Sequence, residues 1–377
     1  MKYKFEDIAI NSTAKKLPEP SDNEHYIGLE HLDSGNLYVT RWGAETAPIG
    51  EKLLMKKGDV LFGKRRAYQK KVGIAPFDGI FSAHGMVLRP KENVICKEFF
   101  PFFISSDYFL NEAIRISVGG LSPTINWKDL RVLEFELPSL DEQRVLADKL
   151  WAAYEVKESY KNLLAQTDKL LHAQFEKMFG EVETTKYEVK DVKSFADCYA
   201  GATPSTRVAD YWENGTIPWM SSGEVHQGRV KRTEQFITQK GYDNCSTKIV
   251  PKHSIVIALA GQGKTRGTVA ITEIDLCTNQ SLCAIIPNNT VLPDYLYYHL
   301  KGRYLEIRRL AANADGRGGL NLSIINRIKI IVPPMEKQLE FVRIAEQSEK
   351  TKESLNKGIE AIEAVIRSLI AEGTTKV

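Results

Sequence analysis

The stretch from Pro138 to Gly180 reads PSLDEQRVLADKLWAAYEVKESYKNLLAQTDKLLHAQFEKMFG, with no proline or glycine between its two ends. Ser139 and Asp141 are suitable N-cap residues, so the stretch predicts one long helix. Apolar residues follow steps of four and three, which is typical of a coiled-coil seam. Lys157 and Gln174 interrupt the seam, which consists of Leu146, Leu150, Ala153, Tyr160, Leu164, Thr167, Leu171 and Met178.

A second helix with the same pattern is predicted near the end of the chain. Gly358 lies inside it and marks either a close crossing or a bend, because glycine lowers helix propensity. Each helix has about 35–40 residues and would be about 55–60 Å long. The second seam consists of Val342, Ala345, Leu355, Ile359, Ile362, Ile366 and Leu369.

Both apolar stripes need cover, because an isolated helix with such a stripe exposes it to water. We predict that the two helices cover each other as an antiparallel coiled coil, which would place their domains at opposite ends. The alternative is that each helix packs on its own domain or on a second chain.

The chain repeats itself under a shift of 195 residues over about 85 residues. Pro138 falls on Pro333 and Gln143 on Gln338, and a Gly-Gly-Leu segment precedes each proline. Strand-like runs recur in both copies, at 52–55 and 254–259 and before each proline, at 132–137 and 328–332. The fold class is therefore α+β, with an internal pseudo-twofold repeat of two mixed α/β domains and two long helices. The boundaries expected are domain 1 at 1–138, helix 1 at 139–180, domain 2 at 181–334 and helix 2 at 335–372.

The composition excludes several classes of protein. The net charge of the 377 residues is only +3, so any basic surface must come from local clustering. The five cysteines form no CxxC pair, which favours reduced thiols and no metal site. The first residues are too polar to predict a leader peptide, and no apolar run reaches membrane-spanning length. We therefore predict a cytoplasmic protein without membrane contact.

Residues 258–265, ALAGQGKT, nearly spell a phosphate-binding P-loop. A P-loop needs a helix after its Lys-Thr pair, whereas residues 266–272 predict a strand. A basic hairpin loop is the better interpretation, and residues 63–71 form its counterpart. Such loops can neutralise phosphates and contact bases, although a solvated basic loop is the alternative. The candidate contacts are Lys64, Arg65, Arg66, Tyr68, Gln69, Lys70 and Lys71 in the first copy, and Gln262, Lys264, Thr265 and Arg266 in the second.

Further candidates follow turns at comparable places in both copies. An exposed polar hairpin, helix capping or plain turn chemistry explains each of them equally well. They are Asn36, Tyr38, Arg41, His84, Thr124 and Asn126 in the first copy, and Arg229, Lys231, Asn279, Gln280, Arg317 and Asn321 in the second.

Three motifs give a family resemblance that extends over essentially the whole chain. Residues 201–205 (GATPS), followed by Tyr211-Trp212 and by residues 217–220 (IPWM), resemble the opening signature of a target recognition domain from Type I restriction–modification specificity subunits. Both Pro-x-x-x-x-Gln segments resemble that family's entry into a helix. The first domain departs most, because residues 26–30 carry only a Gly-x-Glu echo of residues 222–224.

The resemblance implies a non-catalytic subunit that reads a bipartite site in double-stranded DNA. The paired helices would set the gap between two half-sites, and they would dock two modification methyltransferase subunits. S-adenosylmethionine, ATP and Mg²⁺ are then expected only on partner subunits, which can include motor-nuclease restriction subunits. The sequence shows no catalytic motif and no metal site. Two alternatives stay open, namely a P-loop nucleotide hydrolase and a stand-alone DNA-binding regulator.

Overall fold

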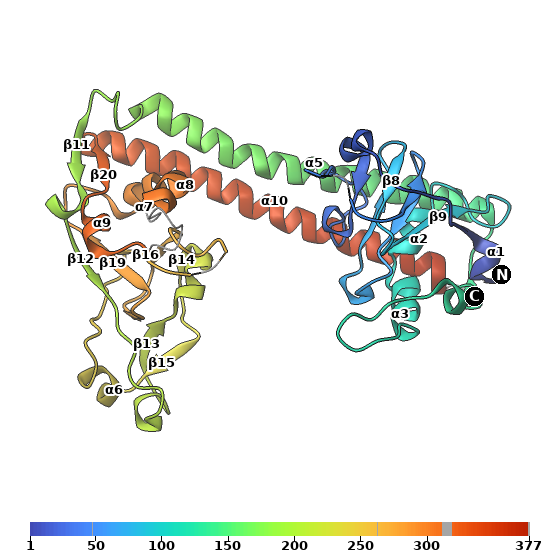
Figure 1. The fold of residues 1–377 in the computed structure, drawn as a ribbon. Helices are drawn as coiled ribbons and strands as arrows, with labels where there is room; N and C mark the ends of the chain where they lie inside the picture. The colour runs from blue at the N-terminus through green and yellow to red at the C-terminus, as the bar shows by residue number, and fades with distance from the viewer. Residues whose placement is uncertain (47, 262, 311–318, 376–377) are drawn as a thin grey trace. The chain divides into compact units, whose positions relative to one another are not determined.

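The structure is a computed structural model that describes residues 1–46, 48–261, 263–310 and 319–375. It divides into two compact units. Unit 1 comprises residues 1–162 and 355–377, and unit 2 comprises residues 163–354. Each unit therefore holds one mixed domain together with part of each long helix (Figure 1).

The two long helices confirm the first prediction. Helix α5 spans Leu140–Phe179 and has 40 residues, and α10 spans Met335–Thr375 and has 41 residues. At the start of α5, the Ser139 N–H and hydroxyl both donate to Glu142 Oε2, at 2.9 and 2.7 Å. Each helix begins shortly after a short strand that a proline ends.

The described residues of the unit 1 domain form three sheets. Their strand orders are β1-β10, β2-β9-β6-β7 and β3-β5-β8-β4. The same residues form four short α-helices: α1 (Phe5–Ile8), α2 (Phe100–Ser105), α3 (Asp107–Arg115) and α4 (Trp127–Leu130). The strands are β1 (Lys2–Lys4), β2 (Ala9–Ser12), β3 (Lys15–Lys16), β4 (Tyr26–Ile27), β5 (Lys52–Met55), β6 (Val60–Phe62), β7 (Val72–Ile74), β8 (Gly79–Phe81), β9 (Met86–Pro90) and β10 (Glu134–Glu136).

The unit 2 domain has the strand orders β11-β20, β12-β19-β16-β17-β14 and β15-β13-β18. Its helices are α6 (Gln239–Asp243), α7 (Pro293–Gly302), α8 (Tyr304–Leu310) and α9 (Leu322–Asn326). Its strands are β11 (Glu188–Asp191), β12 (Ala196–Ala200), β13 (Ile217–Met220), β14 (Arg229–Val230), β15 (Gln235–Ile237), β16 (Ile255–Ala258), β17 (Val269–Thr272), β18 (Cys277–Thr278), β19 (Leu282–Pro287) and β20 (Lys329–Val332).

The two domains share a topology, which confirms the internal repeat. The order β2-β9-β6-β7 in unit 1 corresponds to β12-β19-β16-β17 in unit 2. A parallel pair, β4 with β8 and β13 with β18, occurs in each domain, and so does the antiparallel pair formed by the first and last strands. The strand-like runs found in the sequence form β5, β10, β16 and β20.

A buried glutamine ties each long helix to its own domain. Gln143 donates through Nε2 to the carbonyls of Val94 and Pro138, at 3.1 and 3.0 Å, and its Oε1 accepts from Cys96 N at 2.7 Å. Gln338 repeats this pattern with the carbonyls of Thr290 and Pro333 and the N–H of Leu292. Both glutamines are 0% exposed. The glutamine of each Pro-x-x-x-x-Gln segment is therefore a polar anchor: its side chain pairs buried backbone N–H and carbonyl groups near the start of a long helix.

The helix segments within unit 1 run antiparallel. Lys157 Nζ lies 4.0 Å from Glu363 Oε1, and a Cβ on Gly373 would meet Leu146 Cδ1. A Cβ on Gly358 would come within 2.5 Å of the Tyr160 ring. Gly358 therefore marks a close crossing of the two helices, which settles the choice left by the sequence.

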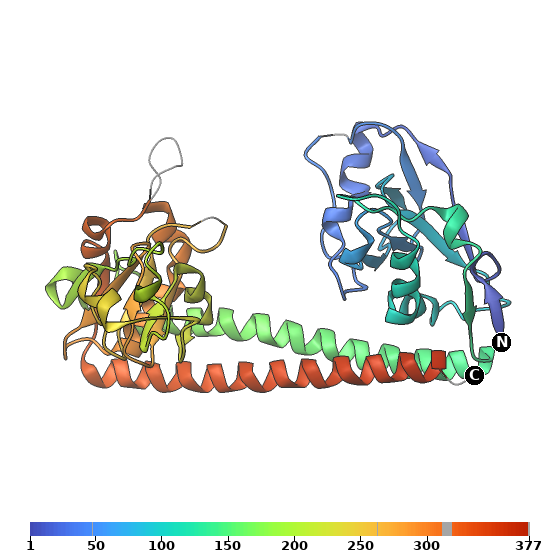
Figure 2. The ribbon, with the colours of Figure 1, turned by 90° about the horizontal axis from the view of Figure 1, so that it is seen from below.

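The helix segments within unit 2 also run antiparallel. Lys352 Nζ lies 2.9 Å from Asp168 Oδ1, and the rings of Phe175 and Phe341 are 5.2 Å apart. A shift of 195 residues converts the Lys157–Glu363 pair into the Lys352–Asp168 pair. Within each unit, Figures 1 and 2 show the α10 segment alongside the α5 segment.

The apolar stripe of each long helix packs partly against the other long helix and partly against the domain. In unit 1, Leu146 and Leu150 of α5 and Ile370 of α10 belong to the main core of the domain. In unit 2, Phe179 of α5 and Phe341 of α10 belong to the corresponding core. Helix pairing and packing on the domain were posed as alternatives, and each unit uses both.

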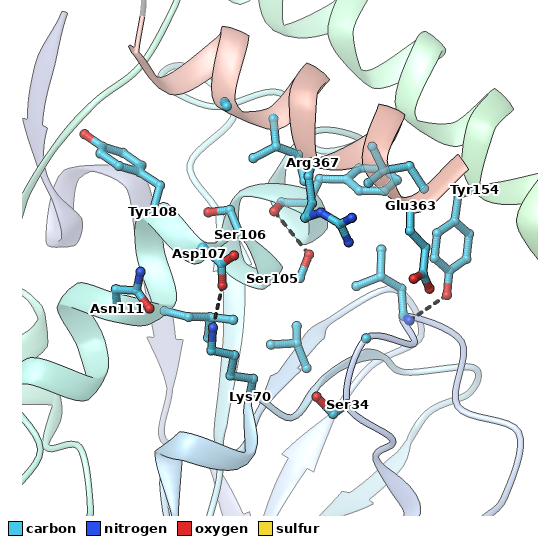
Figure 3. A pocket seen from close by; sticks show the side chains of 18 of the residues that line it. Ser34, Lys70, Ser105, Ser106, Asp107, Tyr108, Asn111, Tyr154, Glu363 and Arg367 are labelled. Carbon is cyan, nitrogen blue, oxygen red and sulfur yellow. Dashed lines mark hydrogen bonds and ion pairs between the residues drawn. The ribbon is translucent and has the colours of Figure 1, made fainter. Parts of the chain in front are cut away.

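Unit 1 also contains a cavity of about 870 Å³ between its domain and its helices. Lys70, Asp107, Tyr154, Glu363 and Arg367 lie around it, as Figure 3 shows. Apolar side chains, including Phe102, Leu110 and Ile370, form other parts of its wall.

Candidate nucleic-acid interface

Three loops of unit 1 meet beyond the C-terminal end of β6. They are residues 63–71 between β6 and β7, residues 82–85 between β8 and β9, and residues 122–126 before α4. We call this surface the three-loop face of unit 1. It brings together Lys64, Arg65, Arg66, His84, Thr124 and Asn126, which were candidates from sequence.

Backbone hydrogen bonds hold the three loops together. Arg65 N donates to His84 O at 3.2 Å, and Arg66 N donates to Pro123 O at 2.8 Å. Ile125 N donates to Lys64 O at 2.9 Å. The cations of the first loop are therefore carried on a fixed backbone rather than on a free segment.

The local conformation of residues 63–71 orients the side chains. Arg66 and Lys70 have positive φ values of 54° and 48°, which bound a short 3-10 turn at Ala67–Gln69. Ala67 is buried beneath the turn, while Arg66 and Tyr68 are exposed. Non-glycine residues adopt positive φ rarely, so the neighbouring loop bonds must stabilise this shape.

The charges on this face are mainly positive. Burial and then the nearby Lys15 lower the pKa of Lys64. Burial, followed by the charges of Arg65, Lys64 and Lys52, lowers the pKa of His84. Lys15 and Lys52 were not among the sequence candidates, because they lie on β3 and β5, outside the basic loop.

Other residues of the basic loop are held within the protein. Lys70 Nζ forms an ion pair with Asp107 at 2.5 Å, and Lys71 Nζ donates to Leu29 O at 2.6 Å. Tyr68 is 55% exposed, and Gln69 is half-buried. The structure thus places Arg65 and Arg66 outward, and it turns Lys70 and Lys71 toward unit 1 partners.

Unit 2 has the same arrangement of loops. Its three-loop face consists of residues 259–261 and 263–268 between β16 and β17, residues 279–281 and residues 319–321. Leu320 N donates to Leu259 O at 3.0 Å, which repeats the bond from Ile125 to Lys64 at a shift of 195 residues.

The course of the backbone excludes a P-loop at these residues. Strands β16 and β17 pair antiparallel, so residues 259–268 close a hairpin. Lys264 and Thr265 lead into a turn and then into β17, where a P-loop requires a helix N-terminus. Gln262 lies outside the described residues.

The hairpin of unit 2 is surrounded by polar side chains that the sequence did not single out. Tyr304 OH donates to Lys264 O at 3.1 Å, and Arg308 Nη1 donates to Tyr304 OH at 2.6 Å. His226 Nε2 lies 3.1 Å from Thr265 Oγ1. Lys264 is exposed and Arg266 is half-buried. Arg308 and His226 belong to this face only through tertiary contacts.

The remaining polar candidates of this face have structural partners as well. Asn279 Oδ1 accepts from Ser281 N at 3.1 Å, and Gln280 Oε1 accepts a hydrogen bond from the Thr203 hydroxyl. Asn321 caps α9 by accepting from Ile324 N at 3.0 Å. Arg317 lies outside the described residues.

Five candidates lie in local contacts away from these faces. Tyr38 donates its hydroxyl proton to Glu155 Oε1. Asn36 Oδ1 accepts from Tyr154 OH at 2.6 Å, and Arg41 Nη2 pairs with Asp33 at 2.6 Å. Arg229 pairs with Asp294 at 2.5 Å and with Glu273 at 3.3 Å. Burial lowers the pKa of Arg229, but Asp294 and Tyr298 outweigh this effect and raise it above its usual value. Lys231 remains mostly exposed.

The family model for the Type I restriction modification DNA specificity domain matches residues 5–166 and 184–364. These two matches together cover most of the chain and one domain each. The chain belongs to this family.

Several curated relatives are specificity subunits. The chain is 29% identical over 182 residues to the Type I restriction enzyme EcoR124I/EcoR124II specificity subunit of Escherichia coli. That alignment covers 48% of this chain and 44% of the relative, so it spans less than half of the relative's length. The HindI specificity subunit of Haemophilus influenzae is 26% identical, over 88% of this chain and 90% of the relative.

Solved structures of the family share the fold. One neighbour comes from a structure concerned with complex assembly and conformational transition of the type I R-M system. It matches with a TM-score of 0.61 at 17% identity, and the alignment covers 99% of this chain and 97% of the neighbour. The S subunit from M. genitalium has a TM-score of 0.56 at 15% identity, covering 98% of this chain and 94% of its own.

The family signature in unit 2 has a structural explanation. A Cβ on Gly201 would lie 2.0 Å from Thr278 O, so only glycine fits against β18. Trp219 Nε1 donates to Ala202 O at 3.1 Å, and the Trp212 ring packs edge-on against Trp219. In unit 2, Glu224 caps a 3-10 turn by accepting a hydrogen bond from Ser221 N. In unit 1, His31 takes this position and accepts from Gly28 N at 2.9 Å. The first domain thus performs the same capping with a different side chain.

No described helix has the length and apolar character needed to cross a bilayer. No group of three or more His, Cys, Asp or Glu side chains that could hold a metal ion occurs among the described residues.

Proposed function

We propose that this chain is the subunit that gives a Type I restriction–modification complex its sequence specificity, and that it reads a bipartite DNA site through two domains. The observation that carries the proposal is the three-loop face, which occurs once in each unit with the same backbone bond between its first and third loops. A duplicated reading surface suits a target with two parts.

Each face combines cations with groups that can contact bases. Lysine and arginine neutralise phosphates, and arginine, asparagine and glutamine pair with base edges in the major groove. In unit 1 the proposed contacts are Lys64, Arg65, Arg66 and His84. In unit 2 they are Lys264, Arg266, Asn279 and Gln280. Arg229, paired with two carboxylates, is a structural residue in this proposal.

The long helices offer apolar surface to partner subunits. Leu163 and Leu170, seven residues apart on α5 in unit 2, are 48% and 69% exposed. Val365, which the repeat places at the position of Leu170, is 51% exposed on α10. Exposed apolar residues at heptad spacing suit docking of further helices. We propose that two methyltransferase subunits dock here and bring S-adenosylmethionine, and that restriction subunits bring ATP and Mg²⁺. The chain itself then performs no catalysis and works in the cytoplasm.

The test is selection of bound duplexes from a randomised pool by the full-length chain, followed by methylation with and without the methyltransferase subunits. We expect a two-part motif and methylation only when the methyltransferase is present. The variant with Lys64, Arg65 and Arg66 changed to alanine should bind more weakly. The slope of its log binding constant against log salt concentration should become shallower by about two to three.

The matched control changes Lys56, Lys57 and Lys91 to alanine. These lysines lie at the opposite end of β6 and β9 from the three-loop face, because β6 ends at the face and antiparallel β9 begins there. The control removes the same charge and should keep most of the affinity. Equal loss in both variants, or a motif without two parts, would contradict the proposal.

A further inference from the structure

We propose that Arg65 reads a guanine in the half-site of unit 1, and that His84 is the residue that positions it. This inference rests on the proposed function, since it concerns the same three-loop face. It assigns one base and one side-chain pair to a surface that is otherwise described only by its charge.

The backbone fixes Arg65 from two sides. Its N–H donates to His84 O at 3.2 Å, and Arg65 forms an antiparallel bridge with Thr124 of the third loop. The side chain is nevertheless exposed, so its guanidinium is available to a ligand. A fixed backbone beneath an exposed arginine reduces the entropy lost when the side chain binds.

The ring of His84 orients the guanidinium. Arg65 Nη1 and His84 Nε2 lie 3.4 Å apart. Arginine carries donors and no acceptor, so this contact is a hydrogen bond only when Nε2 accepts. That requires a neutral His84 with its proton on Nδ1. The contact uses one of the five N–H groups of Arg65 and leaves the others to pair with a base.

The surroundings of His84 favour this neutral state. The charged groups that act on it are Arg65 and Lys64 from the same face and Lys52 from β5, and all three are cations. Ser82 Oγ accepts from the His84 backbone N–H at 3.3 Å. A protonated ring would stand among like charges and would lose the lone pair that Arg65 uses.

Guanine is the base that matches this arrangement. Its N7 and O6 are two adjacent acceptors on the major-groove edge, and they fit two N–H groups of one planar guanidinium. Adenine offers N7 beside an amino donor, which would face an arginine donor. Arg65 therefore discriminates between the two purines by about 10-fold to 100-fold.

Unit 2 lacks this pair at the equivalent positions. A shift of 195 residues places Ala260 at the position of Arg65 and Asn279 at that of His84. Asn279 Oδ1 is engaged by Ser281 N. The guanine preference that depends on Arg65 and His84 should thus belong to one half-site only, which makes the other half-site an internal reference.

The experiment compares motifs selected from a randomised duplex pool by the full-length chain and its variants at pH 7.5. R65A should lose a guanine at one position of one half-site and keep the other half-site intact. R65K keeps the charge without the planar fork, so it should bind with similar affinity but accept other bases at that position. R144A, at an exposed arginine of α5 outside the three-loop face, is the matched control and should change neither the affinity nor the motif.

His84 is tested by a substitution and by pH. H84F removes the acceptor and should reduce the guanine preference by about 5-fold, whereas H84Q supplies an acceptor and should retain it. In the wild type the preference should fall as the pH is lowered below 6.5, toward pH 5, and it should not fall in H84Q. A structural role alone would not give this pH difference.

The outcomes separate the two proposals. A two-part motif that R65A or R65K leaves unchanged overturns the guanine assignment while the proposed function stands. A guanine preference that is equal in wild type and H84F, at both pH values, overturns the role of His84. A wild-type chain that selects no two-part motif overturns both proposals.

Discussion

Units 1 and 2 keep the same polar anchors but fill the spaces around them differently. Both have a fully buried glutamine at the helix entry and a lysine–carboxylate pair between the helices. In unit 2, Phe175 packs against the rings of Tyr295, His299 and Phe341. The repeat places Ile370 at the position of Phe175, and Ile370 lines the cavity of unit 1.

The difference shows which parts of the repeat are constrained. Backbone hydrogen bonds at the helix entry and between the loops occur in both copies, because a buried unpaired polar group is costly. Side chains that fill space or face outward vary between the copies, because several residues satisfy those positions. Specificity can therefore change on the three-loop faces without loss of the framework.

The largest effect is expected at the glutamine anchors. Gln143→Leu leaves the Cys96 N–H and the carbonyls of Val94 and Pro138 without their partner, so unit 1 should lose about 3 kcal/mol of stability. Gln338→Leu should have a similar effect on unit 2. Chemical denaturation with unit-resolved hydrogen exchange measures both changes. Arg144→Ala, at an exposed helix position, is the control and should change stability by less than about 0.5 kcal/mol. A loss of unfolding free energy below about 1 kcal/mol in either glutamine variant would show that the two units do not depend on this contact equally.

Acid should destabilise unit 2 before unit 1. His299 is fully buried, its Nε2 accepts from Ile331 N at 3.1 Å, and burial lowers its pKa to about 3. The unfolded state binds the proton near pH 6.5, so the stability contribution is complete above that pH. It should fall by about 2 kcal/mol at pH 5. The repeat places Ile104, which does not titrate, at this position in unit 1.

His299→Gln is the control for the acid effect, since glutamine can still accept from Ile331 N but does not titrate in this range. The difference between the stabilities of unit 2 at pH 7 and pH 5 should shrink in this variant. An unchanged difference would assign the acid sensitivity to another group.

Gly358→Ala should destabilise unit 1 by about 1–2 kcal/mol, because the new methyl group would overlap the Tyr160 ring. In a Tyr160→Ala background, Gly358→Ala should instead stabilise unit 1 by about 1 kcal/mol, because alanine has a higher helix propensity than glycine. Thermal unfolding of the four proteins in this cycle measures the coupling. Additive effects would show that the ring moves aside without cost.

The smallest effect concerns the cavity. Ile370→Phe copies Phe175 of unit 2 and should stabilise unit 1 by about 1 kcal/mol through additional apolar burial. The reciprocal Phe175→Ile should destabilise unit 2 by leaving a void. Denaturation midpoints measure both. Destabilisation by Ile370→Phe would mean that the polar side chains of the cavity wall leave no room for the ring.

The sequence predicted much of the framework. The absence of proline and glycine between Pro138 and Gly180 was enough to predict α5, and the 195-residue repeat predicted the shared topology. The strand signal after Lys264-Thr265 correctly separated a hairpin from a P-loop. The DNA-contacting residues remain predictions, and the structure regrouped them: Lys70, Lys71 and Arg229 have partners within the protein.

Local patterns determined the helices, the strands and the duplication, because periodicity and turn residues act over a few neighbouring positions. Only the tertiary structure decided which side chains meet: in one unit Lys15 acts on Lys64, and Lys64 and Lys52 act on His84, while in the other His226 and Arg308 lie around the hairpin. These residues come from separate strands and loops, and no local pattern records their proximity. Their charges act on one another through space, so their chemistry depends on the folded chain.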